Sequence, residues 1–208
     1  MPLKEKLPNQ LFYLAFTTVE DVVGKNGLNS VLNYTGLKKF INNNPPNTLD
    51  LEHPTEDFTK FLSGMISVFG ENGSRSMMLR SGMRSFQIML DDFPGLFNLE
   101  GVEIKKGASD KLFKEYVRIQ HTIIDAAKYI FGDDLYKQYE TDDMAVLEIS
   151  PCYWCMGLET KSPICHGEVG FKLGAARWIF GKDIRIEETH CIAKGDPMCR
   201  FVMYRPKD

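Results

Sequence analysis

The segment CHGEVGFKLGAARWIFGKDIRIEETHCIAKGDPMCRFVMY, residues 165–204, gives the strongest indication of the fold. Apolar residues recur at helical spacing over residues 166–180, and two strand-like runs follow at residues 184–192 and 198–204. A Lys-Gly-Asp-Pro turn at residues 194–197 separates the two runs, which is typical of a β-hairpin. The segment therefore predicts one helix followed by an antiparallel hairpin.

The cysteines gather around this segment, since all five lie in the final third of the chain. On the second run, Cys199, Phe201 and Met203 share parity, so Cys199 is expected to point inward. On the first run, Glu188 has the parity of the apolar residues. A buried carboxylate must be protonated, paired with a base or bound to a metal. Several thiols beside such a carboxylate are typical of a metal site.

The composition is that of a folded protein, with 208 residues and 43% hydrophobic content. The 25 basic and 28 acidic side chains are spread along the chain and leave a net charge of −3, which argues against direct nucleic-acid binding. No apolar run approaches the roughly 20 residues of a membrane span, and the start lacks the apolar stretch of a secretion signal. We expect a cytoplasmic protein whose cysteines are thiols, metal ligands or redox groups.

The first half of the chain is predicted to be helical. Helical spacing covers residues 11–23, 55–69 and 74–90, with a shorter helix through residues 28–32. Asparagines and two prolines at residues 42–47 predict a loop. The methionines of the third helix could line a pocket for a bulky apolar ligand, although an ordinary core explains them better.

Candidate pocket residues lie on two helices and one loop. Arg80 and Arg84, four residues apart, share a face that either clamps a ligand carboxylate or is solvated. The longest predicted helix begins near Ser109 and ends at Gly132, and it carries Tyr116 and His121 as candidate ligand contacts. Trp154 is a further candidate, in the loop after a strand at residues 144–149. A short strand is also expected at residues 101–105.

The helix over residues 166–180 bears Gly167, Gly170 and Gly174 on one stripe. Each glycine costs a helix roughly 1 kcal/mol relative to alanine. Three of them in one helix predict that backbone or a flat ligand packs directly against this stripe.

These residues together resemble the 4-vinyl reductase domain. The features that carry the resemblance are Cys165, the glycine-bearing helix, Gly181-Lys182 and the pattern Glu188-x-x-Cys191-x-Ala193-x-Gly195-Asp196-x-x-Cys199-x-Phe201. The family includes bacteriochlorophyll-biosynthesis proteins, effector domains of activators that respond to aromatic compounds, and archaeal redox-responsive regulators. The resemblance covers about residues 100 to 205.

The resemblance implies an α/β (α+β) fold in which helices cover an antiparallel sheet and enclose an apolar cavity, in a homodimer. It also implies a zinc ion held by Cys165, Glu188, Cys191 and Cys199. We expect residues 1–95 to form a helical amino-terminal part packed on the same core as the ligand-binding domain of residues 96–208, the two forming one structural unit.

Cys152 and Cys155 depart from this pattern, because the zinc set does not need them. Their Cys-x-x-Cys spacing occurs in both metal and dithiol sites. They are either a redox pair, ligands of a second metal or buried thiols, and four of the five cysteines could instead hold an iron–sulfur cluster.

Three functions follow from the sequence. The first is a binding module, carrier or sensor for a small hydrophobic ligand that is aromatic or tetrapyrrole-like. The second is a vinyl reductase, or an accessory to one, in chlorophyll-type biosynthesis, although no dinucleotide fingerprint, flavin-type loop or acid/base pair supports catalysis. The third is a thiol or iron–sulfur redox sensor. The sequence favours the non-enzymatic binding module.

Overall fold

The structure is a computed structural model that describes residues 4–93, 95 and 109–207. Its helices are α1 (Asn9–Tyr34), α2 (Thr55–Asp92), α3 (Ser109–Phe131) and α4 (His166–Phe180), and its strands are β1 (Lys6–Pro8), β2 (Leu51–Pro54), β3 (Tyr136–Glu140), β4 (Met144–Ile149), β5 (Ile186–His190) and β6 (Cys199–Tyr204). The strand predicted at residues 101–105 lies outside the described residues.

The two long amino-terminal helices each break once, as the sequence predicts. Backbone dihedrals leave the helical region at Gly24 in α1 (φ 73°, ψ 166°) and at Gly70 in α2 (φ 71°, ψ 167°). Glycine occupies such positive-φ positions without the steric cost that a Cβ atom brings. The helices predicted on either side of each glycine are therefore confirmed, and the loop predicted at residues 42–47 follows α1.

The carboxy-terminal part is a four-stranded antiparallel sheet in the order β3-β4-β6-β5. In the predicted hairpin, β5 pairs with β6, and the register shifts between Glu188 and His190. Cys199, Phe201 and Met203 are fully buried, so the predicted parity of β6 is confirmed.

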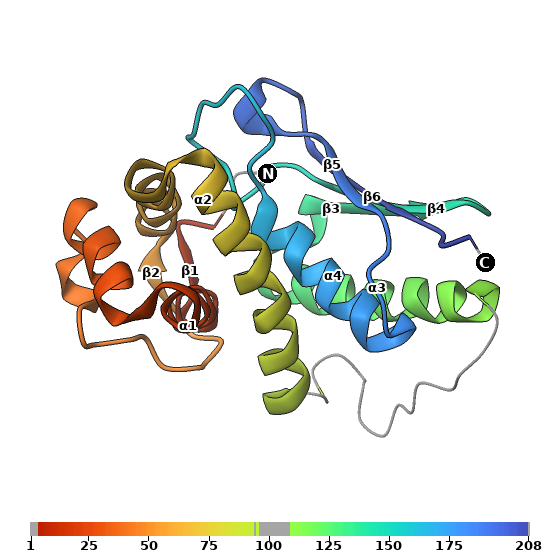
Figure 1. The fold of residues 1–208 in the computed structure, drawn as a ribbon, viewed down its shortest axis with the longest axis horizontal. Coiled ribbons are helices and arrows are strands. Elements are labelled where there is room, and N and C mark those ends of the chain that lie inside the picture. The colour runs from red at the N-terminus through yellow and green to blue at the C-terminus, as the bar shows by residue number, and fades with distance from the viewer. Residues whose placement is uncertain (1–3, 94, 96–108, 208) are drawn as a thin grey trace.

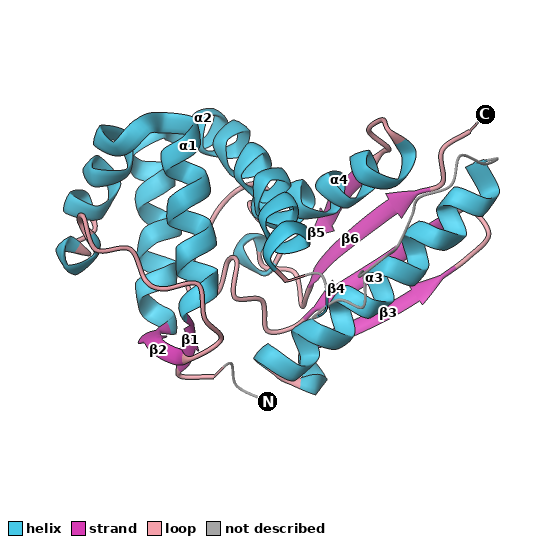
Figure 2. Ribbon diagram, turned by 90° about the horizontal axis from the view of Figure 1, so that it is seen from below, coloured by secondary structure: helices cyan, strands magenta, loops and turns pink. Residues whose placement is uncertain are grey.

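Helices α3 and α4 lie on one face of this sheet, and α1 and α2 lie beside it (Figures 1 and 2). The second half of α2 runs against α4 (Figure 1). The predicted α/β architecture, with helices covering an antiparallel sheet, is confirmed. The boundary near residue 95 stays a prediction.

Two glycines of the α4 stripe, Gly170 and Gly174, face α2, whereas Gly167 faces the Trp154 ring. A Cβ atom added at Gly170 would lie 2.2 Å from the Leu79 carbonyl oxygen, and one added at Gly82 of α2 would lie 2.1 Å from the Gly167 carbonyl oxygen. A Cβ at Gly174 would lie 2.8 Å from the Phe86 Cβ. The prediction that backbone packs directly on this stripe is confirmed, and its partner is α2.

Three strands have no clear signal in the sequence. β1 and β2 pair only with each other, in a two-stranded sheet beside the amino-terminal helices. β3, with the sequence YKQYE, lies at the sheet edge and alternates only weakly between apolar and polar residues. Short edge strands need few apolar residues, so alternation alone does not reveal them.

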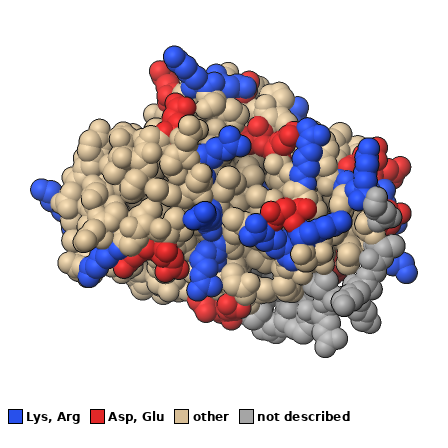
Figure 3. Space-filling model, in the orientation of Figure 1, with Lys and Arg blue, Asp and Glu red and all other residues tan. Residues whose placement is uncertain are grey.

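The face of the molecule in Figure 3 carries lysine and arginine side chains interspersed with aspartate and glutamate. No broad patch of one charge is visible on that face. Among the described residues, no helix is both long and apolar enough to cross a membrane.

Candidate metal centre and ligand cavity

Five buried cysteines meet where the sheet, α4 and the loop after β4 converge. Cys152 and Cys155 lie in that loop, Cys165 immediately precedes α4, Cys191 follows β5, and Cys199 begins β6. Each is at most 1% exposed, and none forms a disulfide. The fold therefore brings together thiols that lie up to 47 residues apart in the chain, between Cys152 and Cys199.

The ligand atoms fall into two sets of four, within each of which all atoms lie within 4.8 Å of one another. One set is Cys152, Cys155, Cys165 and Cys199, and the other is Cys165, Glu188, Cys191 and Cys199. The second set is the one that the family resemblance implies, and the structure brings its members together. The first set shows that Cys152 and Cys155, the Cys-x-x-Cys pair, belong to the same cluster.

Sulfur separations in the cluster fit tetrahedral coordination. The Sγ atoms of Cys165 and Cys199 are 3.7 Å apart, and the Sγ atoms of Cys152 and Cys191 lie 3.8 and 4.0 Å from that of Cys165. With metal–sulfur bonds of about 2.3 Å, the edge of a tetrahedron is roughly 3.8 Å. The Sγ atoms of Cys155 and Cys199 are closer, 3.3 Å apart, so a tetrahedral ion in the all-cysteine set requires these two atoms to separate by about 0.5 Å.

Glu188 has one carboxylate oxygen available for such an ion. Its Oε2 atom accepts a hydrogen bond from the backbone N–H of Cys165 at 2.8 Å. Its Oε1 atom is buried and has no hydrogen-bond partner among the described residues. A buried oxygen without a partner is costly, and a bound cation would satisfy it.

The electrostatics of the cluster also favour a cation. Burial, with the negative charge of Cys191 as the next cause, raises the pKa of the Glu188 carboxyl to about 9. Burial likewise raises the pKa of the thiols of Cys152 and Cys165. These shifts reflect the cost of gathering buried negative charges, and a metal ion removes that cost by binding the deprotonated groups.

Backbone groups of the β5–β6 turn support the cluster. The N–H of Ile192 donates to Cys199 Sγ at 3.3 Å, which stabilises sulfur in its thiolate form. Asp196 Oδ2 accepts a hydrogen bond of 2.8 Å from the N–H of Cys191. The Gly195-Asp196 turn of the sequence pattern therefore holds Cys191 in place.

An apolar cavity of about 100 Å³ lies among α1, α2, α3, α4 and β3. Most residues that line the cavity are aliphatic or aromatic. The lining residues are Pro8, Gln10, Leu11, Leu14, Ala15, Met78, Ser81, Gly82, Ser85, Met89, Ile123, Ile124, Ala127, Ile130, Phe131, Tyr136, Tyr153, Trp154, Gly167, Glu168 and Phe171. The predicted apolar cavity is thus present, and the methionine-bearing part of α2 contributes Met78 and Met89.

A few polar groups face this cavity. Gln10 Nε2 is buried and makes no hydrogen bond within the described residues. The buried Tyr136 hydroxyl lies beside the Tyr153 hydroxyl, and hydrogen bonding between the two acts to lower the pKa of Tyr136. Burial, followed by the charge of Glu168, raises the pKa of Tyr136 well above its usual value, so its hydroxyl stays protonated. A mostly apolar cavity with a small number of convergent polar groups is the usual form of a small-molecule site.

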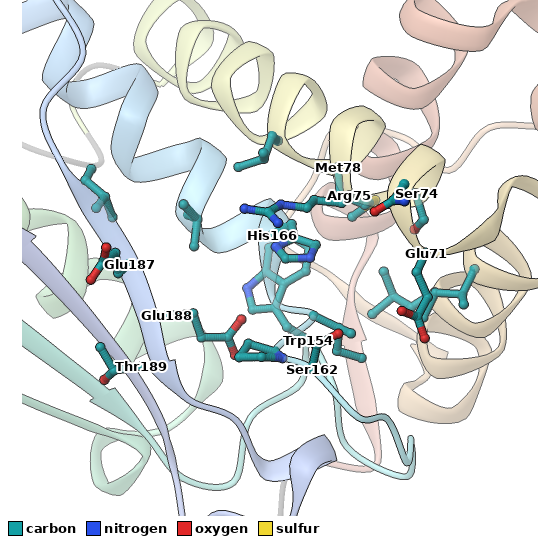
Figure 4. Close-up of a pocket in the computed structure, with 18 residues that line it drawn as sticks. Glu71, Ser74, Arg75, Met78, Trp154, Ser162, His166, Glu187, Glu188 and Thr189 are labelled. Atoms are coloured by element: carbon teal, nitrogen blue, oxygen red, sulfur yellow. The ribbon is translucent and has the colours of Figure 1, made fainter.

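A second, more open cleft of about 540 Å³ borders the cysteine cluster. Figure 4 shows Glu188 of β5, Trp154 of the cysteine loop, His166 at the start of α4 and Arg75 of α2 around it. Burial and the charge of Arg75 lower the pKa of His166 to about 4. Trp154 lines both this cleft and the apolar cavity, so its indole separates the two.

The predicted pocket residues are not brought together. Trp154 lines the cavity, whereas Tyr116 is fully buried, with its hydroxyl donating to the Lys172 carbonyl oxygen. His121 lies on the surface near Glu140, 3.6 Å away. Arg80 and Arg84 are exposed, and Arg84 pairs with Asp21 at 3.6 Å. Of the two alternatives for Arg80 and Arg84, the structure has the one in which both side chains lie on a solvated face.

Sequence reasoning missed a buried polar network behind the cavity. Lys172 is 1% exposed, and its Nζ lies 3.1 Å from Glu168 Oε1 and 3.2 Å from Gln120 Oε1. Glu168 Oε2 accepts a hydrogen bond of 3.0 Å from Trp154 Nε1. The i,i+4 spacing of Glu168 and Lys172 was visible in the sequence, but exposed helix pairs have the same spacing.

Comparison with known protein families identifies a 4-vinyl reductase domain at residues 145–205. This match confirms the family resemblance over that segment, which contains all five cysteines and Glu188. The uncharacterized protein MJ1642 of Methanocaldococcus jannaschii is 29% identical over 109 residues, covering 49% of this chain and 58% of that protein. The chain thus matches little more than half the length of this curated relative.

Two solved structures resemble the whole fold. A Tt H-NOX with two substitutions aligns with a TM-score of 0.62 and 16% identity, covering 97% of this chain and 96% of that chain. A structure reported as "Modulating Heme Redox Potential Through Protein-Induced Porphyrin Distortion" aligns with a TM-score of 0.61 and 12% identity, covering 95% and 99%. Similarity at this level of identity shows a shared fold.

Proposed function

We propose that this chain, which carries a 4-vinyl reductase domain at residues 145–205, binds a small hydrophobic ligand in the apolar cavity and acts as a carrier or sensor. The observation that carries the proposal is the cavity itself, with its mostly apolar lining and the buried Tyr136 among the residues that form it. A thiolate-rich zinc site braces the wall of this cavity.

The size of the cavity favours a ligand of about one aromatic ring. Its volume of about 100 Å³ is of the same order as the roughly 150 Å³ engineered cavity that binds benzene in another protein. Cofactor pockets of about 300–1,000 Å³ are larger, and no histidine occurs among the described residues that line the cavity. A heme group, named for one of the structural neighbours, does not fit it.

The loop that links the cavity to the cluster supports a sensing role. In Cys152-Tyr153-Trp154-Cys155, the two cysteines belong to the cluster and the two aromatic residues line the cavity. A Cβ atom at Gly167 would lie 2.4 Å from the Trp154 ring, so the indole packs tightly against α4. A ligand that moves the ring of Tyr153 or Trp154 therefore also displaces the neighbouring Cys152 and Cys155, which belong to the cysteine cluster.

Zinc is the metal that this donor set suits best. Thiolates and carboxylate oxygens are both zinc ligands, and zinc binds four of them in tetrahedral geometry. The three cysteines of this set are buried, and Glu188 borders the open cleft. The buried cysteines and Glu188 supply these donors, and zinc at the cluster neutralises part of their charge.

Filling the cavity is expected to weaken binding of a small aromatic probe. In the Ala127→Leu variant, the added side chain occupies the space that the probe needs, so we expect benzene and phenol to bind at least about tenfold more weakly, equivalent to 1.4 kcal/mol. Isothermal calorimetry on the purified protein measures this change. Ala126→Leu is the matched control, because the neighbouring alanine is half-buried on the same helix but does not line the cavity.

The two variants together decide the proposal. Equal loss of binding in both variants would point to a general effect on folding. Unaltered binding in Ala127→Leu, or no binding of either probe to the unmodified protein, would contradict ligand binding in this cavity.

Removing the metal is expected to destabilise the protein. Binding of a structural zinc ion is coupled to folding and adds to stability. Each kcal/mol corresponds to roughly 2–4 °C for a chain of this size, so a contribution of about 5 kcal/mol corresponds to about 10–20 °C. A strong zinc chelator should therefore lower the melting temperature by about 10–20 °C, measured by circular dichroism. The same chelator should leave the Cys199→Ser variant almost unaffected, and an equal shift in both proteins would refute a metal contribution.

A further inference from the structure

We propose that the cysteine cluster holds two divalent metal ions, with the thiolates of Cys165 and Cys199 bridging them. This inference rests on the proposed metal site and extends it from one ion to two. Cys152 and Cys155 complete the coordination of the first ion, and Glu188 and Cys191 complete that of the second. The family resemblance assigns no such role to Cys152 and Cys155.

The sharing of ligands is the first argument. Each set of four donors is complete for one tetrahedral ion, and the two sets have Cys165 and Cys199 in common. The six donors form two sets rather than one, so they do not all lie within 4.8 Å of one another. The two unshared pairs, Cys152 with Cys155 and Glu188 with Cys191, are therefore the terminal ligands. The shared sulfurs of Cys165 and Cys199 lie between these terminal pairs.

The spacing of the shared sulfurs is the second argument. Two tetrahedra that share an edge need bridging sulfurs about 3.8 Å apart for metal–sulfur bonds of about 2.3 Å. Cys165 Sγ and Cys199 Sγ are 3.7 Å apart. Cys152 Sγ lies 3.8 Å and Cys191 Sγ 4.0 Å from Cys165 Sγ, so each terminal pair has one member at edge distance from the same bridging sulfur.

A single ion would leave two of the six donors without a metal, although the thiols among them keep their contacts with neighbouring sulfurs. An ion in the all-cysteine set leaves Cys191 and the unpartnered Oε1 atom of Glu188 unbound. An ion in the other set leaves Cys152 and Cys155 unbound, at 0% and 1% exposure. Two ions give every one of these groups a ligand role, including the Glu188 Oε1 atom, which has no hydrogen-bond partner among the described residues.

Charge is the fourth argument. When fully deprotonated, the five cysteines and Glu188 would carry six negative charges. One divalent ion leaves four of these charges uncompensated, whereas two ions leave two. Because uncompensated buried charge is expensive, the second ion stabilises the deprotonated cluster.

Metal content of the intact protein tests the proposal directly. The full chain, produced in zinc-supplemented cells and desalted, is measured by inductively coupled plasma mass spectrometry with protein quantified by amino-acid analysis. We expect two zinc ions per chain, and a cobalt(II) titration of the metal-free protein should reach its thiolate charge-transfer endpoint at two equivalents. One ion per chain overturns the bridged pair and leaves the single zinc site intact, whereas no metal overturns both.

Substitutions of the terminal ligands show which residues hold each of the two ions. Cys155→Ala and Cys191→Ala should each lower the content from two ions to one, and Cys199→Ala should lower it below one. Ser162→Ala, an exposed change in the same loop region, should leave two. Retention of the full metal content in Cys155→Ala would overturn the proposal, as would two irons with equimolar inorganic sulfide, because sulfide would then be the bridge.

Discussion

Replacing Lys172 with methionine is expected to lower the free energy of unfolding by about 3–5 kcal/mol, the usual cost of removing one partner of a buried ion pair. Lys172 Nζ lies 3.1 Å from Glu168 Oε1, and the side chains of the pair are 1% and 10% exposed. Methionine preserves the length and apolar stem of lysine but removes the cation. Glu168 is then left with the Trp154 indole N–H as its hydrogen-bond donor.

Urea denaturation followed by circular dichroism measures this loss. Lys60→Met is the matched control, because Lys60 and Glu56 have the same i,i+4 spacing on α2 but are 47% and 74% exposed. Breaking that exposed pair should cost less than about 1 kcal/mol. The double variant Lys172→Met with Glu168→Gln should recover part of the loss. Similar costs for Lys172→Met and Lys60→Met would disprove the structural role of the buried pair.

Replacing Gly170 with alanine is expected to destabilise the protein by about 3 kcal/mol, at the upper end of the usual cost of overpacking. The added Cβ atom would lie 2.2 Å from the Leu79 carbonyl oxygen and 2.9 Å from its carbonyl carbon. Both obstructing atoms belong to the backbone of α2, so no side-chain rotation relieves the clash. The two helices must separate, and the cavity wall that they share moves with them.

Gly73→Ala on α2 is the control for this change. Its Cβ atom would meet only the Phe69 Cβ, at 3.3 Å, and alanine favours a helix over glycine by up to about 1 kcal/mol. Gly73→Ala should therefore be nearly neutral or stabilising in the same denaturation experiment. A Gly170→Ala variant as stable as the unmodified protein would show that α2 and α4 do not pack through this glycine.

Much of the fold was predictable because its long elements repeat their apolar residues at helical spacing. The predicted helix of residues 166–180 and the hairpin after it were found, and the breaks at Gly24 and Gly70 fall where the pattern stops. Strand β3 was missed because its sequence YKQYE carries little alternation. The packing of α2 on α4 depends on glycines in both helices, including Gly82 of α2 and Gly170 of α4. The sequence pattern indicated only the glycines of α4.

The sequence was enough to predict some ligands of the metal site, but not that Cys152 and Cys155 join the same cluster. The parity of β5 and β6 places Cys199 and Glu188 inward, and this needs no tertiary information. The joining of Cys152 and Cys155 to the same cluster depends on how the loop after β4 folds across the sheet, which no local pattern encodes. The cavity lining likewise comes from elements far apart in the chain, so spacing alone selected exposed residues such as Arg80 and His121.

Occupation of the apolar cavity by a small hydrophobic ligand is the proposal on which the function depends. Methyl NMR of the protein labelled with ¹³C-methyl methionine is its sharpest test, because Met78 and Met89 line the cavity, whereas Met65 and Met203 are fully buried elsewhere. Titration with benzene or phenol should shift the Met78 and Met89 signals saturably and leave those of Met65 and Met203 in place. Unchanged Met78 and Met89 signals at the solubility limit of both probes would contradict ligand binding there.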